Sequence, residues 1–167
     1  MAVAELTVQN TEALAQALTA LGDRAVQAAG GALYREGRRI MAVARARVPV
    51  DMDTLRSSGI VQPPVVDGTR VGVTLGFGGA AKTYALFVHE GIGPAVGRPA
   101  FMPPVDAIRP WVRRHGIPEE RAFVVARAIG RRGLRPTKYL ESAMLEAQAG
   151  LADRLAADLR GELAQGR

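Results

Sequence analysis

The chain contains no cysteine, few aromatic residues and only two histidines among 167 residues. Without cysteine it can form neither a disulfide framework nor a thiolate metal site, and it has no thiol nucleophile. Two histidines without a cysteine also argue against a zinc cluster. Aromatic residues make up 5% of the sequence, which argues against platforms that stack nucleic-acid bases. The absence of cysteine suits a reducing compartment.

Long hydrophobic runs are also missing. No stretch of about 18 apolar residues occurs, so the sequence predicts no membrane-spanning helix and no membrane partner. The first residues lack the basic and apolar regions of a signal peptide, which predicts a product of the cytoplasm. With 48% hydrophobic residues the chain can build a core, and its length suits one domain. We therefore expect residues 1–167 to form a single domain, with residues 164–167 frayed.

Lysine is nearly absent: 20 of the 22 basic residues are arginine, and Lys82 and Lys138 are the two lysines. The net charge of +6 is unevenly distributed, because residues 98–138 hold ten basic and three acidic side chains. A basic middle fits contact with DNA, ion pairs with acidic neighbouring subunits, or a solvated face, and the composition leaves all three open. The candidate DNA-facing residues are Arg109, Arg113, Arg114, Arg131, Arg132 and Arg135.

The first fifty residues have strand and helix patterns. Residues 4–8 fit a short strand, and apolar residues at helical spacing predict a helix over residues 11–21. A longer apolar stripe predicts a second helix from about residue 24 to residue 47. Gly30 and Gly31 lie inside it, where they mark either a bend or a close approach to another element.

The stretch 48–58 follows the long helix and forms a corner. Pro49 disfavours α geometry at the preceding residue, so the helix should end there. Asp51 and Asp53 can accept hydrogen bonds from the backbone N–H groups that follow them, and Leu55 is the one large apolar anchor. The simplest interpretation is a helix-to-strand corner with a structural role, assigned to Pro49, Asp51, Leu55 and Ser57.

A β-rich region comes next. Residues 60–61 begin a strand that Pro63 limits, Asp67-Gly68 is a hairpin signal, and residues 71–77 alternate as a half-buried strand does. We predict a further strand over residues 84–90.

Residues 91–104 form a loop without a regular pattern, and three helices are expected after it. Pro110 lies in the first of these, which either kinks there or begins late, near Asp106. The second should run from Pro118 to the residue before Gly133, with Phe123, Ala126 and Ile129 on its apolar face. The third should run from after Thr137 to about residue 163. The predicted fold class is α+β, with a small, mainly antiparallel sheet packed against a long helix and additional C-terminal helices.

Candidate catalytic groups are few. Ser57 or Ser58 with His89 and Asp51 could be drawn as a triad, but no nucleophile-elbow motif supports it. The glycines within residues 76–79 do not match a phosphate-binding loop. We therefore predict no enzyme activity, no cofactor and no metal site, and a hydrolase is the third and weakest interpretation.

A series of short segments runs from residue 47 to residue 143, and its order and spacing are more specific than any single motif. The segments are RVPVD (47–51), LRSS (55–58), YALFVHEG (84–91), GRP (97–99), MPP (102–104), Ile108, WV (111–112), GL (133–134), Pro136, YL (139–140) and Ala143. This series resembles a phage family, the small head–tail joining proteins of long-tailed phages. This is the tail-completion family related to minor tail protein Z, and the similarity covers about residues 6–145.

The resemblance implies an α+β subunit in a ring, often six-fold, between the capsid neck and the tail tube of the virion. It implies a head-side neck or stopper protein and the tail tube protein as partners, non-specific contact with DNA, assembly in the bacterial cytoplasm, and no cofactor or catalytic residue. The chain departs from the family at Met52-Asp53, where threonine-glycine is usual. A turn that needs positive φ there would rest on Asp53, which tolerates it better than most residues.

The loop 91–104 is the candidate interface in such a ring, because long loops without regular structure are usually functional. Arg98, Phe101 and Met102 are residue types typical of interface centres. The alternative is that Phe101 and Met102 belong to the subunit's own core. Our first hypothesis is a structural ring protein, and the alternative function is a basic nucleic-acid-binding accessory protein.

Overall fold

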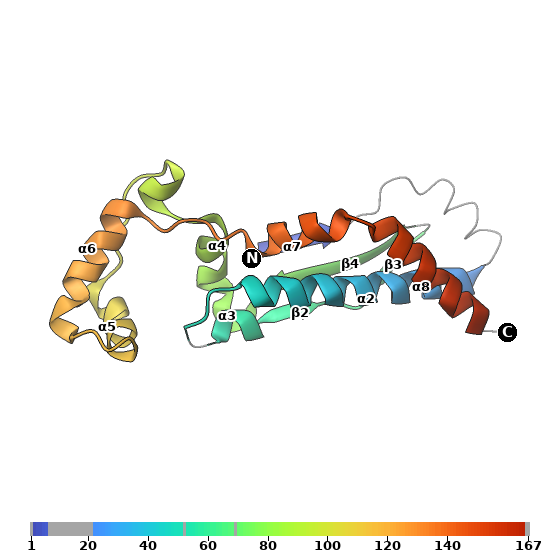
Figure 1. The fold of residues 1–167 in the computed structure, drawn as a ribbon, viewed down its shortest axis with the longest axis horizontal. Helices are drawn as coiled ribbons and strands as arrows, with labels where there is room; N and C mark the ends of the chain where they lie inside the picture. Colours follow the sequence, from blue (N-terminus) through green and yellow to red (C-terminus); the bar gives the residue numbers. More distant parts are fainter. Residues whose placement is uncertain (1, 7–21, 52, 69, 166–167) are drawn as a thin grey trace. The chain divides into compact units, whose positions relative to one another are not determined.

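The computed structural model describes residues 2–6, 22–51, 53–68 and 70–165 (Figure 1). By its internal contacts the chain divides into two compact units. Unit 1 comprises Met1–Lys82 with Tyr139–Arg167, and unit 2 comprises Thr83–Lys138. The α+β class is confirmed, whereas the helix expected over residues 11–21 lies outside the described residues. None of the described helices combines the length and hydrophobicity that a membrane span requires.

The sheet of unit 1 is built around β4 (Arg70–Phe77). This strand pairs antiparallel with β1 (Ala2–Leu6), β2 (Gly59–Val61) and β3 (Val65–Asp67). β1 begins two residues before the expected range of 4–8 and includes residues 4–6 of it, and residues 7 and 8 lie outside the described residues. The hairpin predicted at Asp67-Gly68 is confirmed, because Asp67 is paired with Arg70. Val73, Leu75 and Phe77 are buried at alternate positions of β4, as the sequence pattern predicted.

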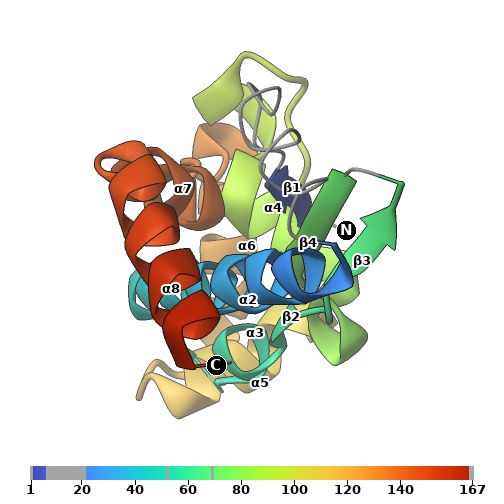
Figure 2. The same cartoon turned by 90° about the vertical axis from the view of Figure 1, so that its right-hand side faces the viewer.

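Helix α2 (Asp23–Arg47) lies against the sheet, and the expected helix over 24–47 is confirmed. Figure 2 shows it between the sheet and the two C-terminal helices. A Cβ atom on Gly37 would lie 3.1 Å from Val61 and 3.2 Å from Val73, and one on Gly30 would lie 3.2 Å from Pro64. These glycines therefore let the helix approach the sheet closely, and Gly30 marks a close approach.

The last predicted helix is two helices, α7 (Tyr139–Gln148) and α8 (Leu151–Gln165). The expectation of one continuous helix to about residue 163 was wrong. Gly150 adopts a positive φ of 70°, which a right-handed helix cannot contain, and this ends α7. α8 also includes residues 164 and 165, which were expected to fray.

A buried carboxylate joins these helices to α2. Glu36 of α2 is 1% exposed and accepts hydrogen bonds from Arg154 Nη2 at 2.5 Å and from Arg39 Nη1 at 3.0 Å. Arg154 of α8 also donates to the carbonyl oxygens of Ala147 and Ala149, at 2.6 and 2.7 Å. Burial alone would raise the pKa of Glu36, but the hydrogen bonds and charges of Arg154 and Arg39 outweigh it and lower that pKa. Glu36 is therefore ionised and paired inside unit 1.

Unit 2 begins with a helix where a strand was predicted. Residues 84–90 belong to α4 (Lys82–Glu90), so the predicted strand was wrong. Ala85 and His89 are buried four residues apart, which is the spacing of one helical face. The end of α4 is held by the chain that leaves the unit, because Val88 and His89 accept hydrogen bonds from the N–H groups of Thr137 and Lys138.

Short helices form the rest of unit 2. A 3₁₀ turn, η2 (Gly93–Val96), is followed by α5 (Val105–Arg114), which begins close to Asp106 and continues through Pro110. A second 3₁₀ turn, η3 (Glu119–Arg121), leads into α6 (Ala122–Arg132), so Pro118 precedes a 3₁₀ turn instead of starting the α-helix. Gly133, at φ 72°, ends α6 as predicted. α5 packs on α6, with Val112, Ala122 and Ala126 fully buried.

The buried carboxylate generates a prediction about stability. Glu36→Gln keeps the shape but removes the charge, and hydrogen bonds to a charged group contribute about 1.5–3 kcal/mol. We expect the free energy of unfolding at pH 7 to fall by that amount, measured by urea denaturation. Because the native pKa of Glu36 is lowered, its stabilisation is complete above its ordinary pKa of 4.5 and is lost as the pH falls through the native value.

The matched control is Glu146→Gln, which makes the same chemical change at an exposed carboxylate paired with exposed Arg47. An exposed pair contributes about 0–1 kcal/mol, so this variant should unfold almost as the parent does. Equal stability of the two variants, or an unchanged acid transition in Glu36→Gln, would contradict the role given to Glu36.

Candidate functional site

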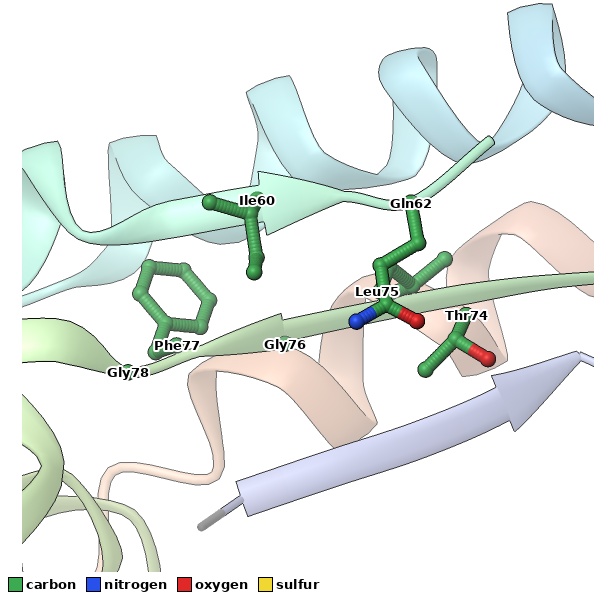
Figure 3. A pocket seen from close by; sticks show the side chains of 7 residues that line it. All are labelled: Ile60, Gln62, Thr74, Leu75, Gly76, Phe77 and Gly78. Atoms are coloured by element: carbon green, nitrogen blue, oxygen red, sulfur yellow. The ribbon is translucent and has the colours of Figure 1, made fainter. Parts of the chain in front are cut away.

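The sheet carries a small hollow along β2 and β4. Figure 3 shows Ile60 and Gln62 leaning toward β4, where Gly76 and Gly78 leave room beside Thr74. The hollow opens to solvent and has a cavity volume of only about 30 Å³. Small-molecule pockets usually enclose roughly 300–1,000 Å³, so this hollow is a poor substrate site.

A second, wider hollow of about 480 Å³ lies at the corner, lined mainly by polar side chains. Its guanidinium groups already have partners, because Arg45 donates to the carbonyl of Gly59 and Arg56 donates to Asp53 at 2.5 Å. Ser57 Oγ donates to a backbone carbonyl at 3.2 Å, and Ser58 Oγ donates to another at 2.7 Å. The polar groups around this hollow therefore stabilise the corner itself.

The corner has the structure that the sequence predicted, with one correction. α2 ends before Val48, whose backbone is extended ahead of Pro49, and Leu55 is buried on the short helix α3 (Thr54–Ser57). Asp51 is exposed. The carboxylate of Asp53 does not cap the following N–H groups as expected, because Arg56 binds it. Asp53 has a φ of 61°, so the left-handed backbone considered at this position is present.

Three polar side chains meet where α4 ends. Glu90 accepts from Lys138 Nζ at 2.6 Å and lies 2.8 Å from His89 Nδ1. A carboxylate only accepts, so His89 carries its proton on Nδ1. The hydrogen bonds from Lys138 and His89 lower the pKa of Glu90. The cluster links α4, the first helix of unit 2, to Lys138, the last residue of that unit. Residues 89 and 90 are helical, whereas in the predicted strand their side chains would have pointed to opposite faces.

A tight crossing of two segments holds the middle of unit 2. Ile92 and Leu134 form an antiparallel bridge, with N···O distances of 3.0 and 2.9 Å. A Cβ on Gly133 would lie 2.2 Å from the Ile92 carbonyl oxygen, and one on Gly91 would lie 2.6 Å from the Leu134 carbonyl oxygen. The two segments can cross only because these positions are glycine.

The loop after this crossing lies against α6. A Cβ on Gly130 would lie 3.1 Å from Met102 Cβ and 3.2 Å from Met102 Cα, so the loop backbone follows the small-residue side of the helix. The side chains point away: Phe101 is 58% exposed, Met102 is 43% exposed, and Arg98 is exposed. In the chain by itself these residues are therefore outside the core.

Other exposed apolar side chains accompany Phe101 and Met102. Thirteen large hydrophobic residues are exposed among those the structure describes, and eight belong to unit 2. Unit 2 therefore presents most of the apolar surface, although it is the smaller unit. Sequence reasoning missed part of it, because it assigned Phe123 to the inner face of α6. The eight are Tyr84, Leu86, Phe87, Phe101, Met102, Phe123, Val124 and Leu134.

The net charge is also concentrated in unit 2. Its ten basic and four acidic side chains account for the whole +6, because unit 1 contains twelve of each. Arg109 lies 3.4 Å from Asp106, and Arg113 lies 3.0 Å from Glu119, so both are paired at the surface. Arg114 is exposed at the end of α5. Three exposed arginines at the end of α6 form no ion pair with another described residue: Arg131, Arg132 and Arg135.

Comparison of the chain with protein-family models, characterised proteins and solved structures gave no match. The candidate site is therefore defined by the chain itself. It is the surface of unit 2, which combines exposed apolar side chains with unpaired arginines.

The corner generates a prediction about backbone conformation. Both Asp53→Gly and Asp53→Ala remove the ion pair with Arg56. Only glycine also removes the steric cost of a side chain in the left-handed backbone conformation. A left-handed backbone costs an L-residue about 1–2 kcal/mol. We expect the glycine variant to be more stable than the alanine variant by about this amount, measured by thermal or urea unfolding. Equal stability of the two would show that the positive φ is absent in solution.

Proposed function

We propose that this chain is a structural subunit of a long-tailed phage virion and not an enzyme. It forms a ring at the head–tail joint, in the tail-completion, terminator or neck position. The ring connects the head-side neck or stopper protein to the tail tube protein and lets DNA pass. The chain is made in the bacterial cytoplasm, and six subunits are the number that the resemblance suggests. The series of matching segments between residues 47 and 143 supports this assignment.

The observation that carries the proposal is the surface of unit 2. A monomeric protein rarely exposes many large apolar side chains together, and such surfaces usually bind another protein. Phe101 and Met102 extend from a loop whose backbone is fixed on α6, so they are held in place before any partner binds. Aromatic residues, methionine and arginine are the types enriched at interfaces. Closed rings use two different patches on each subunit, and this surface supplies one of them.

The alternative is a basic accessory protein that binds nucleic acid. It is favoured by the concentration of the entire net charge in unit 2 and by the unpaired arginines at the end of α6. The two functions differ in what the arginines contact. In a ring they face DNA that passes through the lumen without being read, whereas an accessory protein can read a sequence.

The ring generates a prediction about two exposed side chains. Phe101→Ala combined with Met102→Ala should convert the oligomer to monomer, measured by native mass spectrometry at micromolar concentration. The melting temperature of the monomer should stay close to that of the parent, because neither side chain is buried in the chain itself. An intact ring with a clearly lowered melting temperature would show that the two side chains belong to the subunit's own core.

The matched control is Val65→Ala combined with Val66→Ala, which truncates two adjacent exposed side chains of β3. It removes exposed apolar groups from unit 1 and should leave the oligomer intact. A parent protein that stays monomeric even beside its neck and tail partners would contradict the ring itself.

Contact with DNA is tested by the salt dependence of binding. Each phosphate contact contributes about 0.9 to the slope of log affinity against log salt concentration. Replacing Arg131, Arg132 and Arg135 by glutamine should therefore reduce that slope by up to about 2.7, equally for different duplex sequences. Replacing the surface-paired Arg109 and Arg113 is the control and should reduce it less. A clear preference for one duplex sequence would favour the accessory protein over the ring.

A further inference from the structure

The outer side of α6 carries exposed apolar side chains between two unpaired charges. Phe123 is 51% exposed and Val124 is 62% exposed. Glu120, in η3 directly before α6, and Arg127 are both exposed, and neither forms an ion pair with another described residue. Residues three, four and seven positions apart share one side of a helix, so these four side chains follow one another along one line. They form the α6 stripe.

The arginine of this stripe needs an acidic partner if an interface covers it, because an unpaired charge is costly to desolvate. Of the acidic side chains that the structure describes, three form no ion pair with another described residue: Asp67, Glu120 and Asp153. Glu120 belongs to the α6 stripe itself, and pairing two such stripes would join two copies of unit 2, each with the entire net charge of its chain. Asp67 ends β3 and offers no helical stripe. Asp153 is on α8, in unit 1, where basic and acidic side chains balance.

The outer side of α8 repeats the charge pattern of the α6 stripe. Asp153 and Arg160 are exposed, and neither forms an ion pair with another described residue. Between them Ala157 is exposed and Ala156 is half-buried, while the opposite side of the helix packs on α2. These four residues form the α8 stripe. In both stripes the acid comes first and the arginine follows seven residues later.

The two stripes are complementary when the helices run antiparallel. The acid of each stripe then faces the arginine of the other, so that Glu120 lies opposite Arg160 and Arg127 lies opposite Asp153. The spacing agrees, because seven residues span about 10 Å along a helix with a rise of about 1.5 Å per residue. Parallel packing in the same register would place acid against acid and arginine against arginine. The charges therefore specify both the direction and the register of the contact.

We propose that α6 of one copy packs antiparallel on α8 of the next copy, with the α6 stripe on the α8 stripe. This inference rests on the proposed ring and assigns the second patch that a ring subunit needs. Phe123 and Val124 then lie against the two alanines of α8, whose small side chains let the helices approach closely. The contact joins two different patches, and such heterologous contacts build rings. The arginines at the end of α6 lie beyond the stripe and stay free for other contacts.

The test is a charge exchange within one full-length chain. Arg127→Glu places two acids in every contact, so the protein concentration needed for half-maximal assembly should rise about tenfold or more, measured by native mass spectrometry. Asp153→Arg alone places two arginines there and should have a similar effect. The double variant has opposite charges in every contact again, so it should assemble as the parent does. Melting temperatures near that of the parent show that the variants are folded.

The matched controls combine Arg127→Glu with reversal of each of the other unpaired acids, Glu120→Arg or Asp67→Arg, and neither should restore assembly. Rescue by Glu120→Arg would show instead that α6 packs on α6 of another copy. Rescue by Asp67→Arg would assign the partner surface to the β3 hairpin. The far end of the contact gives an independent repeat, because Arg160→Glu should rescue Glu120→Arg. If Asp153→Arg fails to fold, this second exchange decides.

Failure of the contact and failure of the ring give different results. If the parent assembles but Arg127→Glu assembles equally well, or if neither charge exchange restores assembly, α6 does not pack on α8 and the ring closes through another surface. A parent that stays monomeric even beside its neck and tail partners removes the ring and this contact together.

Discussion

The arrangement of unit 1 depends on one buried charge pair. Glu36 lies inside the unit, where an unpaired carboxylate would cost several kcal/mol. Its main partner, Arg154, is on the last helix, so α8 must turn back over α2 to supply it. The turn is made at Gly150, and the same guanidinium satisfies two carbonyl groups where α7 ends. A single side chain thus connects α2, the end of α7 and the start of α8.

The sequence predicted the parts of the fold that local rules determine. The long helix, its end before Pro49, the Asp67-Gly68 hairpin and the alternating strand were all confirmed, because proline geometry, turn chemistry and period-two burial act within a few residues. The possibility of a positive φ at position 53 came from the resemblance and not from a local rule, and Asp53 has a φ of 61°.

The parts that failed depend on contacts distant in sequence. Residues 84–90 form a short apolar run, which periodicity cannot assign to strand or helix, and the hydrogen bonds that complete the helix end come from residues 137 and 138. The apolar stripe after residue 139 keeps its helical spacing past Gly150, so the sequence pattern did not show that the helix ends there. In the structure Arg154, which follows this end, pairs with Glu36 of α2. Phe123 was assigned to the inner face of α6 because the approach of the Met102 backbone to Gly130 could not be read from spacing.

The candidate surface was only partly visible in the sequence. Composition showed that the basic residues gather in the middle of the chain, and the loop chemistry indicated Phe101 and Met102. The sequence could not show which arginines already form ion pairs. The structure separates Arg109 and Arg113, whose charges are partly neutralised by Asp106 and Glu119, from the arginines at the end of α6. In unit 1, Arg35 and Arg47 form ion pairs with Glu162 and Glu146.

The bridge between Ile92 and Leu134 has a consequence for how such a chain can vary. The chain between these two residues begins and ends at the same bridge, so it forms a closed loop. Backbone hydrogen bonds hold the bridge, and glycines without side chains allow the two segments to approach. A closed loop can change in length and sequence at small entropic cost to the rest of the chain. Residues 93–133 can therefore change in length and sequence while the sheet, α2 and the buried charge pair of unit 1 stay the same.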